Sequence, residues 1–385
     1  MLSAGGVRGA YQVGVLEGIL DVLGRPSAAG ALPVFDTFAG TSIGAFNAAY
    51  LAANAHLGDH AIDGLVETWC RLELGEVLRL TSWRAWGRRG ARVSPYLGRS
   101  LFDPRPIEAL LERTLDWERL GDNVRRGLVR ACVISALDLA DTRTTLFAAL
   151  APGVELRPAA YPARRTLVGP ITAEQVLASM ALPVLLPARN IDGRYYLDGA
   201  LRFPTPIAPA LRAGADRVVV VSLLHRPATP NDGREDPGVA YVLGKILHSL
   251  LLDPVVHDLE NLLRLNRMFE VIGDTLEPGA FVALSRRLEE ELVLPYRAVP
   301  VLVFRPSEDL GLLTAEFIRE DLPRTGVGPV GRRLIRWLSR SDIGQQADIA
   351  SILLLDGRLA ARLIDLGRRD AHAARDRIRG FFALE

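Results

Sequence analysis

Residues 40–44 read Gly40-Thr41-Ser42-Ile43-Gly44 and fit the pattern G-x-S-x-G, which places a serine on a sharp turn between a strand and a helix. Residues 34–39 are apolar and compatible with a strand, and residues 43–53 are rich in alanine and favour a helix. The two glycines allow both elements to approach closely. The stretch predicts a strand–turn–helix unit with Ser42 as a candidate nucleophile, although the pentapeptide alone also fits an ordinary glycine-rich turn.

The composition limits the classes of protein to which the chain can belong. Of 385 residues 49% are hydrophobic, so a sizeable core can form, and 46 basic and 45 acidic side chains nearly cancel, which gives no indication of a nucleic-acid partner. Cys70 and Cys132 lie in apolar surroundings and are expected to be buried free thiols, and no Cys/His cluster has metal-ligand spacing. Without a secretory leader or a bilayer-spanning apolar run, we expect a cytoplasmic protein with peripheral contact, if any, at the inner membrane face.

Strand-like and helical stretches alternate along the chain, which predicts an α/β fold with a parallel, layered core. The expected strands are 34–39, 128–137, 144–149, 217–224 and 299–304, and the expected helices include 10–23, 43–53, 61–74, 106–115 and 173–181. Thr172 is a predicted N-cap. The polar, proline-rich loop 225–237 is the predicted linker, and residues 238–385 are predicted to be a mainly helical region packed on the core.

A glycine-rich loop, Gly5-Gly6-Val7-Arg8-Gly9, lies before the first helix. Such a loop brings backbone N–H groups near an anion, and the helix N-terminus favours negative charge there. The anion could be a dinucleotide pyrophosphate, since Ala4, Gly6 and Gly9 occupy the G-x-G-x-x-G positions, or the oxyanion of an acyl-transfer intermediate. The dinucleotide site needs an acidic residue after the second strand, where the Ser42 turn lies instead. The oxyanion is therefore favoured over the pyrophosphate, and a plain tight turn stays an alternative.

A serine hydroxyl needs a base to act as a nucleophile. None of the six histidines lies in a recognisable motif, and only His225 ends a predicted strand, which leaves it as the alternative base. Asp198 ends a short strand and precedes Gly199-Ala200, where a turn can aim its carboxylate at a cleft. A carboxylate within hydrogen-bond distance of Ser42 could accept the proton itself, although Asp-Gly is also typical of a plain turn.

The chain resembles the bacterial branch of the patatin-like phospholipases. The resemblance covers residues 1–224, the predicted catalytic domain, and rests on the two glycine-containing stretches, Ala178-Ser179-Met180-Ala181-Leu182-Pro183 and Asp198-Gly199-Ala200 in the family's order. It implies a three-layer α/β/α fold with a mostly parallel central sheet, Ser42 as nucleophile, Asp198 as its base, and residues 5–9 as the oxyanion hole. It also implies hydrolysis of fatty acyl esters of phospholipids or other glycerolipids without metal or organic cofactor. Ala4 stands where the family usually has the first of three glycines.

Two other functions remain open: an acyltransferase of similar fold and a catalytically silent lipid-binding scaffold. Residues 83–92 interleave Trp83 and Trp86 with four arginines, which are Arg84, Arg88, Arg89 and Arg92. Tryptophan favours the membrane interface and arginine favours anionic phosphate, so this stretch predicts transient membrane contact. The same stretch also fits a loop whose tryptophans pack into the core. The sequence indicates neither an oligomeric state nor a headgroup preference.

Overall fold

The computed structural model describes residues 1–77, 79–80, 96–97, 100–156, 164–202, 207–225, 253–292, 298–321 and 350–383. The tryptophans and arginines of residues 83–92 lie outside these residues, and so do residues 226–237 of the predicted linker.

A mixed β-sheet forms the centre of the molecule. Within the described residues its strand order is β3-β8-β9-β5-β6-β7, and β1 pairs with β5 on the edge that β9 also uses. The strands are β1 (Thr37–Thr41), β3 (Tyr96–Leu97), β5 (Ala131–Asp138), β6 (Thr144–Leu150), β7 (Arg164–Val168), β8 (Ala188–Ile191) and β9 (Arg194–Asp198).

Two further pairs of strands complete the described β-structure. β10 (Val218–Val221) and β11 (Val301–Phe304) are parallel, and Leu2 forms parallel bridges to Gly40 and Val221 that join this pair to β1. β2 (Arg79–Leu80) and β4 (Phe102–Asp103) form a separate antiparallel ladder.

The expectation of a mostly parallel sheet is met only in part. The ladders β1·β5, β6·β7 and β10·β11 are parallel, whereas β5·β6, β5·β9, β8·β9 and β3·β8 are antiparallel. For β5·β6 and β8·β9 the reason is the short connection, because parallel neighbours need a long crossover. Asp192 and Gly193 alone join β8 to β9, and their φ angles of 50° and 80° suit the twist of a two-residue hairpin.

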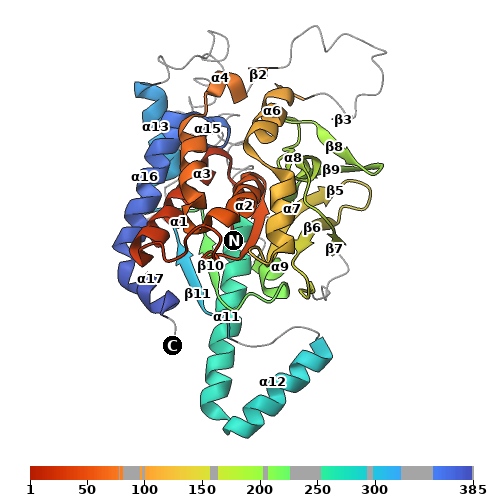
Figure 1. Ribbon diagram of the computed structural model, residues 1–385, viewed down its shortest axis with the longest axis vertical. Coiled ribbons are helices and arrows are strands. Elements are labelled where there is room, and N and C mark those ends of the chain that lie inside the picture. The colour runs from red at the N-terminus through yellow and green to blue at the C-terminus, as the bar shows by residue number, and fades with distance from the viewer. Residues whose placement is uncertain are drawn as a thin grey trace, which may run out of the picture.

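Helices cover both faces of the sheet, so the predicted three-layer α/β/α fold is confirmed (Figure 1). Cys132 and Ile134 of β5 belong to the larger core cluster, whereas Ala131 and Val133 point to the opposite face and pack near Ala210. On that opposite face lie α9 (Ile207–Arg212) and α11 (Asp253–Thr275), and α12 (Pro278–Leu292) projects beyond α11.

The helices of the larger core cluster come from both ends of the chain. They are α1 (Gly9–Leu23), α2 (Ile43–Asn54), α3 (Ala61–Cys70), α4 (Leu74–Val77), α6 (Arg105–Thr114), α7 (Trp117–Arg125), α8 (Ala173–Ser179), α13 (Leu310–Glu320), α15 (Ala350–Leu353), α16 (Gly357–Ala373) and α17 (Arg375–Phe382). Thr172 is confirmed as the N-cap of α8, because its side chain accepts from the Gln175 amide. The short 3-10 helices η1 (Gly6–Arg8), η2 (Ala55–His60) and η3 (Gly199–Leu201) connect other elements.

Helix α16, from the C-terminal region, lies against α1 at backbone contact distance (Figure 1). A Cβ atom at Gly14 would lie 1.9 Å from the carbonyl oxygen of Ile364, and one at Gly367 would lie 2.3 Å from that of Tyr11. A side chain at either position would therefore push the two helices apart.

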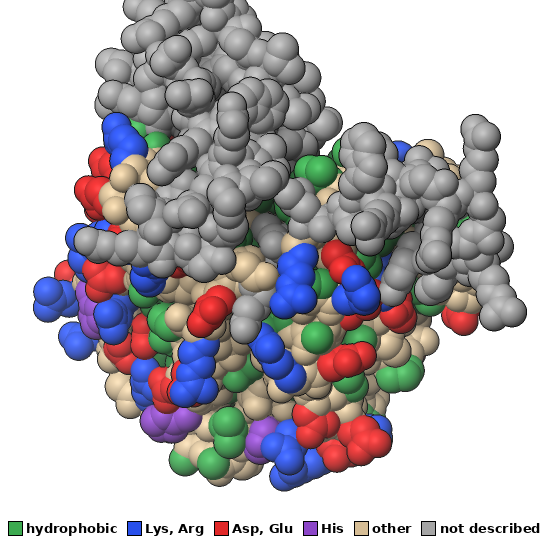
Figure 2. Space-filling view, turned by 90° about the horizontal axis from the view of Figure 1, so that it is seen from above, with side chains coloured by type: hydrophobic (Ala, Val, Ile, Leu, Met, Phe, Trp, Pro, Cys, Tyr) green, Lys and Arg blue, Asp and Glu red, His purple; other side chains and the backbone are tan. Residues whose placement is uncertain are grey.

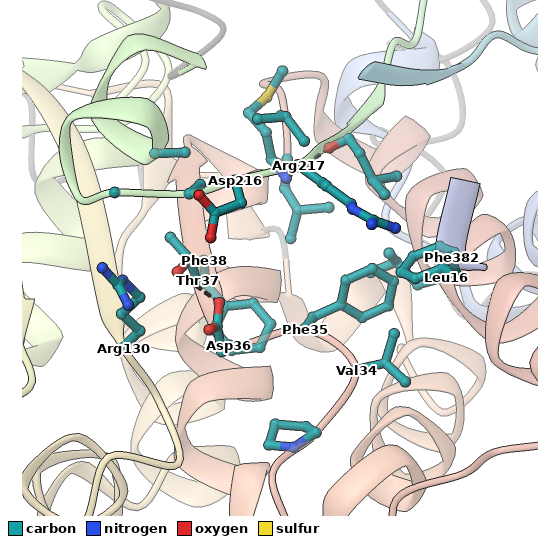
Figure 3. A pocket seen from close by; sticks show the side chains of 18 of the residues that line it. Leu16, Val34, Phe35, Asp36, Thr37, Phe38, Arg130, Asp216, Arg217 and Phe382 are labelled. Carbon is teal, nitrogen blue, oxygen red and sulfur yellow. Dashed lines mark hydrogen bonds between the residues drawn. The ribbon is translucent and has the colours of Figure 1, made fainter. Parts of the chain in front are cut away.

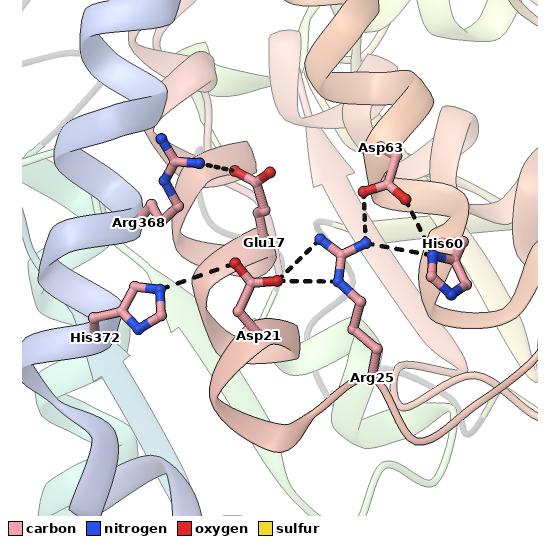
Figure 4. A network of polar contacts seen from close by, with 7 residues as sticks. All are labelled: Glu17, Asp21, Arg25, His60, Asp63, Arg368 and His372. Atoms are coloured by element: carbon pink, nitrogen blue, oxygen red, sulfur yellow. Dashed lines mark hydrogen bonds and ion pairs between the residues drawn. The ribbon is translucent and has the colours of Figure 1, made fainter.

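Polar contacts along the same helix pair border this close packing (Figure 4). Arg368 of α16 lies 4.0 Å from Glu17, and His372 lies 3.9 Å from Asp21. Arg25 links Asp21 to Asp63 through ion pairs of 3.0 and 2.6 Å. These pairs therefore lie beside the glycine positions at which the two helix backbones meet.

Charges of both signs are interspersed on the face drawn in Figure 2, where its residues are described. This mixture agrees with the near cancellation of 46 basic and 45 acidic side chains. Among the described helices, none combines the length and the apolar character that crossing a bilayer requires.

Candidate active site

Two strands meet end to end beside β5 and bring Ser42 and Asp198 together. β1 is parallel to β5 and ends with Thr41 opposite Ser135, whereas β9 is antiparallel to β5 and ends with Asp198 opposite Ala136. The carboxyl ends of β1 and β9 therefore point toward each other at neighbouring positions of one strand. Residues 156 positions apart in the sequence become neighbours in this way.

The Ser42 hydroxyl donates a hydrogen bond of 2.6 Å to Oδ2 of Asp198. Both side chains are buried, and Oδ1 of Asp198 accepts a second hydrogen bond, of 2.8 Å, from the Ala200 amide. Burial raises the pKa of the Asp198 carboxyl from 3.8 to about 7, although the hydrogen bonds from Ser42 and Ala200 act in the opposite direction. A carboxylate with a pKa near neutrality can take the proton of the serine as it attacks.

Ser42 lies on a strained turn, as the G-x-S-x-G pattern predicts. Its φ of 56° is rarely adopted by residues with a side chain, at a cost of roughly 1–3 kcal/mol. The flanking glycines are required by close approach: a Cβ at Gly40 would lie 2.2 Å from the Gly44 carbonyl oxygen, and one at Gly44 would lie 2.2 Å from that of Leu2. The predicted change from strand to helix at this residue is confirmed, since β1 ends at Thr41 and α2 begins at Ile43.

Ser179 supports the turn, a role that the sequence interpretation did not assign. The Ser42 amide donates to the Ser179 hydroxyl at 2.9 Å, and that hydroxyl donates to the Ser135 carbonyl at 2.7 Å. Ser179 is fully buried. Ser179 belongs to the motif at residues 178–183. The feature of the sequence that could have indicated its role is a small polar residue at the end of an apolar helix.

The glycine-rich loop forms η1 and leads into α1. Gly6 has a φ of 58°, and a Cβ there would lie 1.9 Å from the Ile352 carbonyl oxygen, so only glycine fits. The first amides of a helix have no acceptor inside it, so this end of η1 can offer donors to an anion. Gly6 and Ser42 line the same cavity, as an oxyanion hole would require.

Arg8, predicted as part of that loop, is buried and turned toward the C-terminal region. Its Nε and Nη2 atoms donate to the Ser351 hydroxyl at 2.8 and 2.6 Å. The guanidinium therefore anchors the loop. Val7 is also fully buried, and a Cβ at Gly9 would lie 2.8 Å from the Ile43 side chain, so the loop packs directly on the serine turn.

The alternative base, His225, is bonded elsewhere. Its Nδ1 lies 3.0 Å from the carbonyl oxygen of Pro306. The other histidines with described side chains, His56, His60 and His372, contact Arg119, Asp63 and Asp21 respectively. Within the described residues, the group that bonds to the Ser42 hydroxyl is the Asp198 carboxylate.

A small apolar cavity of about 50 Å³ lies beside Ser42. Its lining residues are Gly6, Ser42, Ile43, Phe102, Ile107, Met180, Leu182, Leu185, Leu186, Ile352, Leu353 and Leu355. A larger cavity of about 500 Å³ lies at the other end of β1, near Asp36, Arg130 and Arg217 (Figure 3). Neither Ser42 nor Asp198 lines the larger cavity, so the candidate active site is the smaller one.

The family comparison matches residues 1–211 to a model described as patatin-like phospholipase. None of the curated proteins compared with the chain matches it. The family match includes Ser42, Asp198 and the glycine-rich loop, whereas Ser351, Ile352 and Leu353 lie beyond it.

Proposed function

Because the chain belongs to the patatin-like phospholipase family, a family of lipid acyl hydrolases, we propose that it cleaves fatty acyl esters of phospholipids or other glycerolipids with Ser42 and Asp198. The observation that carries this proposal is the direct hydrogen bond of 2.6 Å between the two buried side chains. We propose the bacterial branch, a cytoplasmic location and transient contact with the inner membrane face on the sequence alone.

In the first step the Ser42 oxygen attacks the ester carbonyl carbon while Asp198 takes the hydroxyl proton. The carbonyl oxygen becomes an oxyanion, and backbone amides at the start of the glycine-rich loop stabilise it, those of Gly5 and Gly6 first, since the Arg8 and Gly9 amides donate to carbonyls within the loop. The intermediate collapses, the bond to the leaving alkoxide breaks, and Asp198 returns the proton to that alkoxide. The products are the alcohol and an acyl-serine.

In the second step water attacks the acyl-serine carbonyl and Asp198 accepts a proton from that water. The second tetrahedral intermediate releases the fatty acid, and the proton returns to the Ser42 oxygen. A single carboxylate can serve both steps because its pKa of about 7 allows it to take and give a proton at neutral pH.

Labelling with an alkyl fluorophosphonate tests the proposal, with hydrolysis of a soluble p-nitrophenyl ester measured in parallel. The wild type should be labelled at Ser42 and should turn over the ester, and Ser42→Ala should lose both properties while its circular dichroism is unchanged. A silent lipid-binding scaffold would show neither labelling nor turnover in the wild type. Acyl transfer to an added alcohol in preference to water would instead identify an acyltransferase.

A further inference from the structure

The wall of the cavity beside Ser42 includes a segment from the C-terminal region. Ile352, Leu353 and Leu355 line this cavity together with Ser42 and Gly6, although they lie beyond the residues that match the family model. They follow Ser42 by more than three hundred positions in the chain. The candidate site is therefore built from two distant parts of the sequence.

Contacts with the glycine-rich loop hold the start of this segment in place. The Ile352 carbonyl oxygen lies so close to Gly6 that a Cβ there would be 1.9 Å away. The Ser351 hydroxyl accepts two hydrogen bonds from Arg8, and both side chains are buried. Movement of the segment would therefore also disturb the loop that we propose as the oxyanion hole.

The end of the segment is fixed as closely. The Gly357 amide donates to the Leu72 carbonyl at 2.7 Å, and a Cβ at Gly357 would lie 2.0 Å from the Cys70 carbonyl oxygen. Directly after it, α16 begins and packs along α1 (Figure 1). With both ends held by backbone contacts, the side chains of Ile352, Leu353 and Leu355 present a defined wall to the cavity.

We infer that Ile352, Leu353 and Leu355 form one wall of the acyl pocket and that Leu353 sets the length and bulk of the acyl chain that Ser42 accepts. This inference rests on the proposed function. The cavity is apolar on every side except at Ser42 and Gly6, so its chemistry suits a hydrocarbon chain whose carbonyl lies at Ser42. Leu353 is only partly buried, so its side chain can be changed with less damage to the core than that of Ile352.

The test is kcat/KM on p-nitrophenyl esters of four and eight carbons. Leu353→Ala should raise the eight-to-four carbon ratio by about tenfold, since a few methylene groups in an apolar pocket change discrimination by that order. Leu353→Phe should lower the ratio, which keeps the test decisive if one variant folds poorly. Leu354→Ala is the matched control, because Leu354 is buried in the same segment but does not line the cavity.

The outcomes separate this inference from the proposed function. Suppose that the wild type hydrolyses both esters through Ser42 and that the Leu353 variants, like Leu354→Ala, keep the wild-type eight-to-four carbon ratio of kcat/KM. That result would overturn the acyl-wall assignment alone. Turnover that survives in Ser42→Ala would overturn the proposed function and this assignment with it. The rates of labelling by fluorophosphonates with two- and eight-carbon alkyl chains should rank the variants in the same order of chain-length preference. Labelling does not include the deacylation step, so it reports on the pocket alone.

Discussion

At Asp198 the surroundings act on one carboxyl in two directions. Complete burial disfavours its charged form, and the Ser42 hydroxyl and the Ala200 amide favour it. Burial has the larger effect, which leaves the pKa at about 7. The same residue is therefore expected to govern both the pH dependence of catalysis and that of folding.

Catalysis should fall on the acid side of neutrality, because a protonated Asp198 cannot take the serine proton. With a pKa of about 7, kcat/KM for a soluble ester should be half its plateau near that pH and fall about tenfold for each further unit of acidification. His225→Gln should show the same profile, since His225 bonds to the Pro306 carbonyl. If His225→Gln lost its activity, or no longer showed the fall of kcat/KM on the acid side of neutrality, the base in the mechanism would be the His225 imidazole and not the Asp198 carboxylate.

The contribution of Asp198 to folding stability should change with pH in the opposite sense to its contribution to catalysis. A folded-state pKa raised from 3.8 to about 7 means that the folded protein binds the proton more tightly than the unfolded chain. The resulting stabilisation is complete below pH 3.8 and is lost as the pH rises through 7. Asp198→Asn should be inactive yet more stable than the wild type at pH 8 by a few kcal/mol, and less so at pH 5. Urea unfolding at both pH values measures this, and a pH-independent difference would contradict it.

At the scale of elements, the site depends on how closely the serine turn packs on the chain around Leu2. Gly44→Ala would place a Cβ 2.2 Å from the Leu2 carbonyl oxygen, so β1 and α2 would have to shift. We expect this variant to lose most ester turnover and at least about 2 kcal/mol of its free energy of unfolding. Gly169→Ala is the control, because no atom lies within 4 Å of a Cβ there and its stability should not change. If Gly44→Ala and Gly169→Ala had equal stabilities, the serine turn would tolerate a greater distance from the chain around Leu2.

The elements with local signals were predictable from the sequence. The serine turn has its glycines, α8 has its capping box, and Asp198 precedes Gly199, whose added Cβ would lie 2.4 Å from the Ser135 carbonyl. The helix α7 was missed, although Asp116 caps it by accepting from the Arg119 amide. The hairpin turn at residues 192–193 also carries an Asp-Gly signal that was not used, and this hairpin makes part of the sheet antiparallel.

The parts of the site that were not predicted depend on contacts between distant residues. The bond between Arg8 and Ser351 joins positions 343 apart, and the bond between Ser42 and Ser179 joins positions 137 apart. No periodicity or short motif encodes such a pair, because each partner is ordinary in its own segment. The sequence could thus indicate a nucleophile and a base, but not the segment that lines the cavity beside them.

At the scale of the whole molecule, the chain that leads into residues 81–95 lies close to the candidate site. Leu80 pairs with Phe102 in the ladder of β2 and β4, and Phe102 lines the cavity beside Ser42. On the other side, Tyr96 pairs with Arg189 at the edge of the central sheet. Trp83 and Trp86 lie outside the described residues, and the chain that precedes them is attached beside the cavity.

The prediction that residues 83–92 bring the site to a lipid surface can be tested at this scale. Replacing both tryptophans with Ala and the four arginines, Arg84, Arg88, Arg89 and Arg92, with Gln should lower hydrolysis of anionic vesicles by at least about tenfold, because each arginine near such a surface contributes about 1 kcal/mol. Hydrolysis of a soluble ester should change little, since the dyad is untouched, and the loss on vesicles should shrink at high salt.

The control for that variant removes the same number of charges from other exposed sites, namely Arg71, Arg105, Arg125 and Arg267. If the effect came from net charge alone, both variants would lose vesicle hydrolysis equally. If residues 83–92 instead supported the fold, the soluble ester and the vesicles would lose turnover together. Only a loss confined to vesicles and to the variant in residues 83–92 fits membrane contact by this segment, because tryptophan favours the membrane interface and does not act through the total charge.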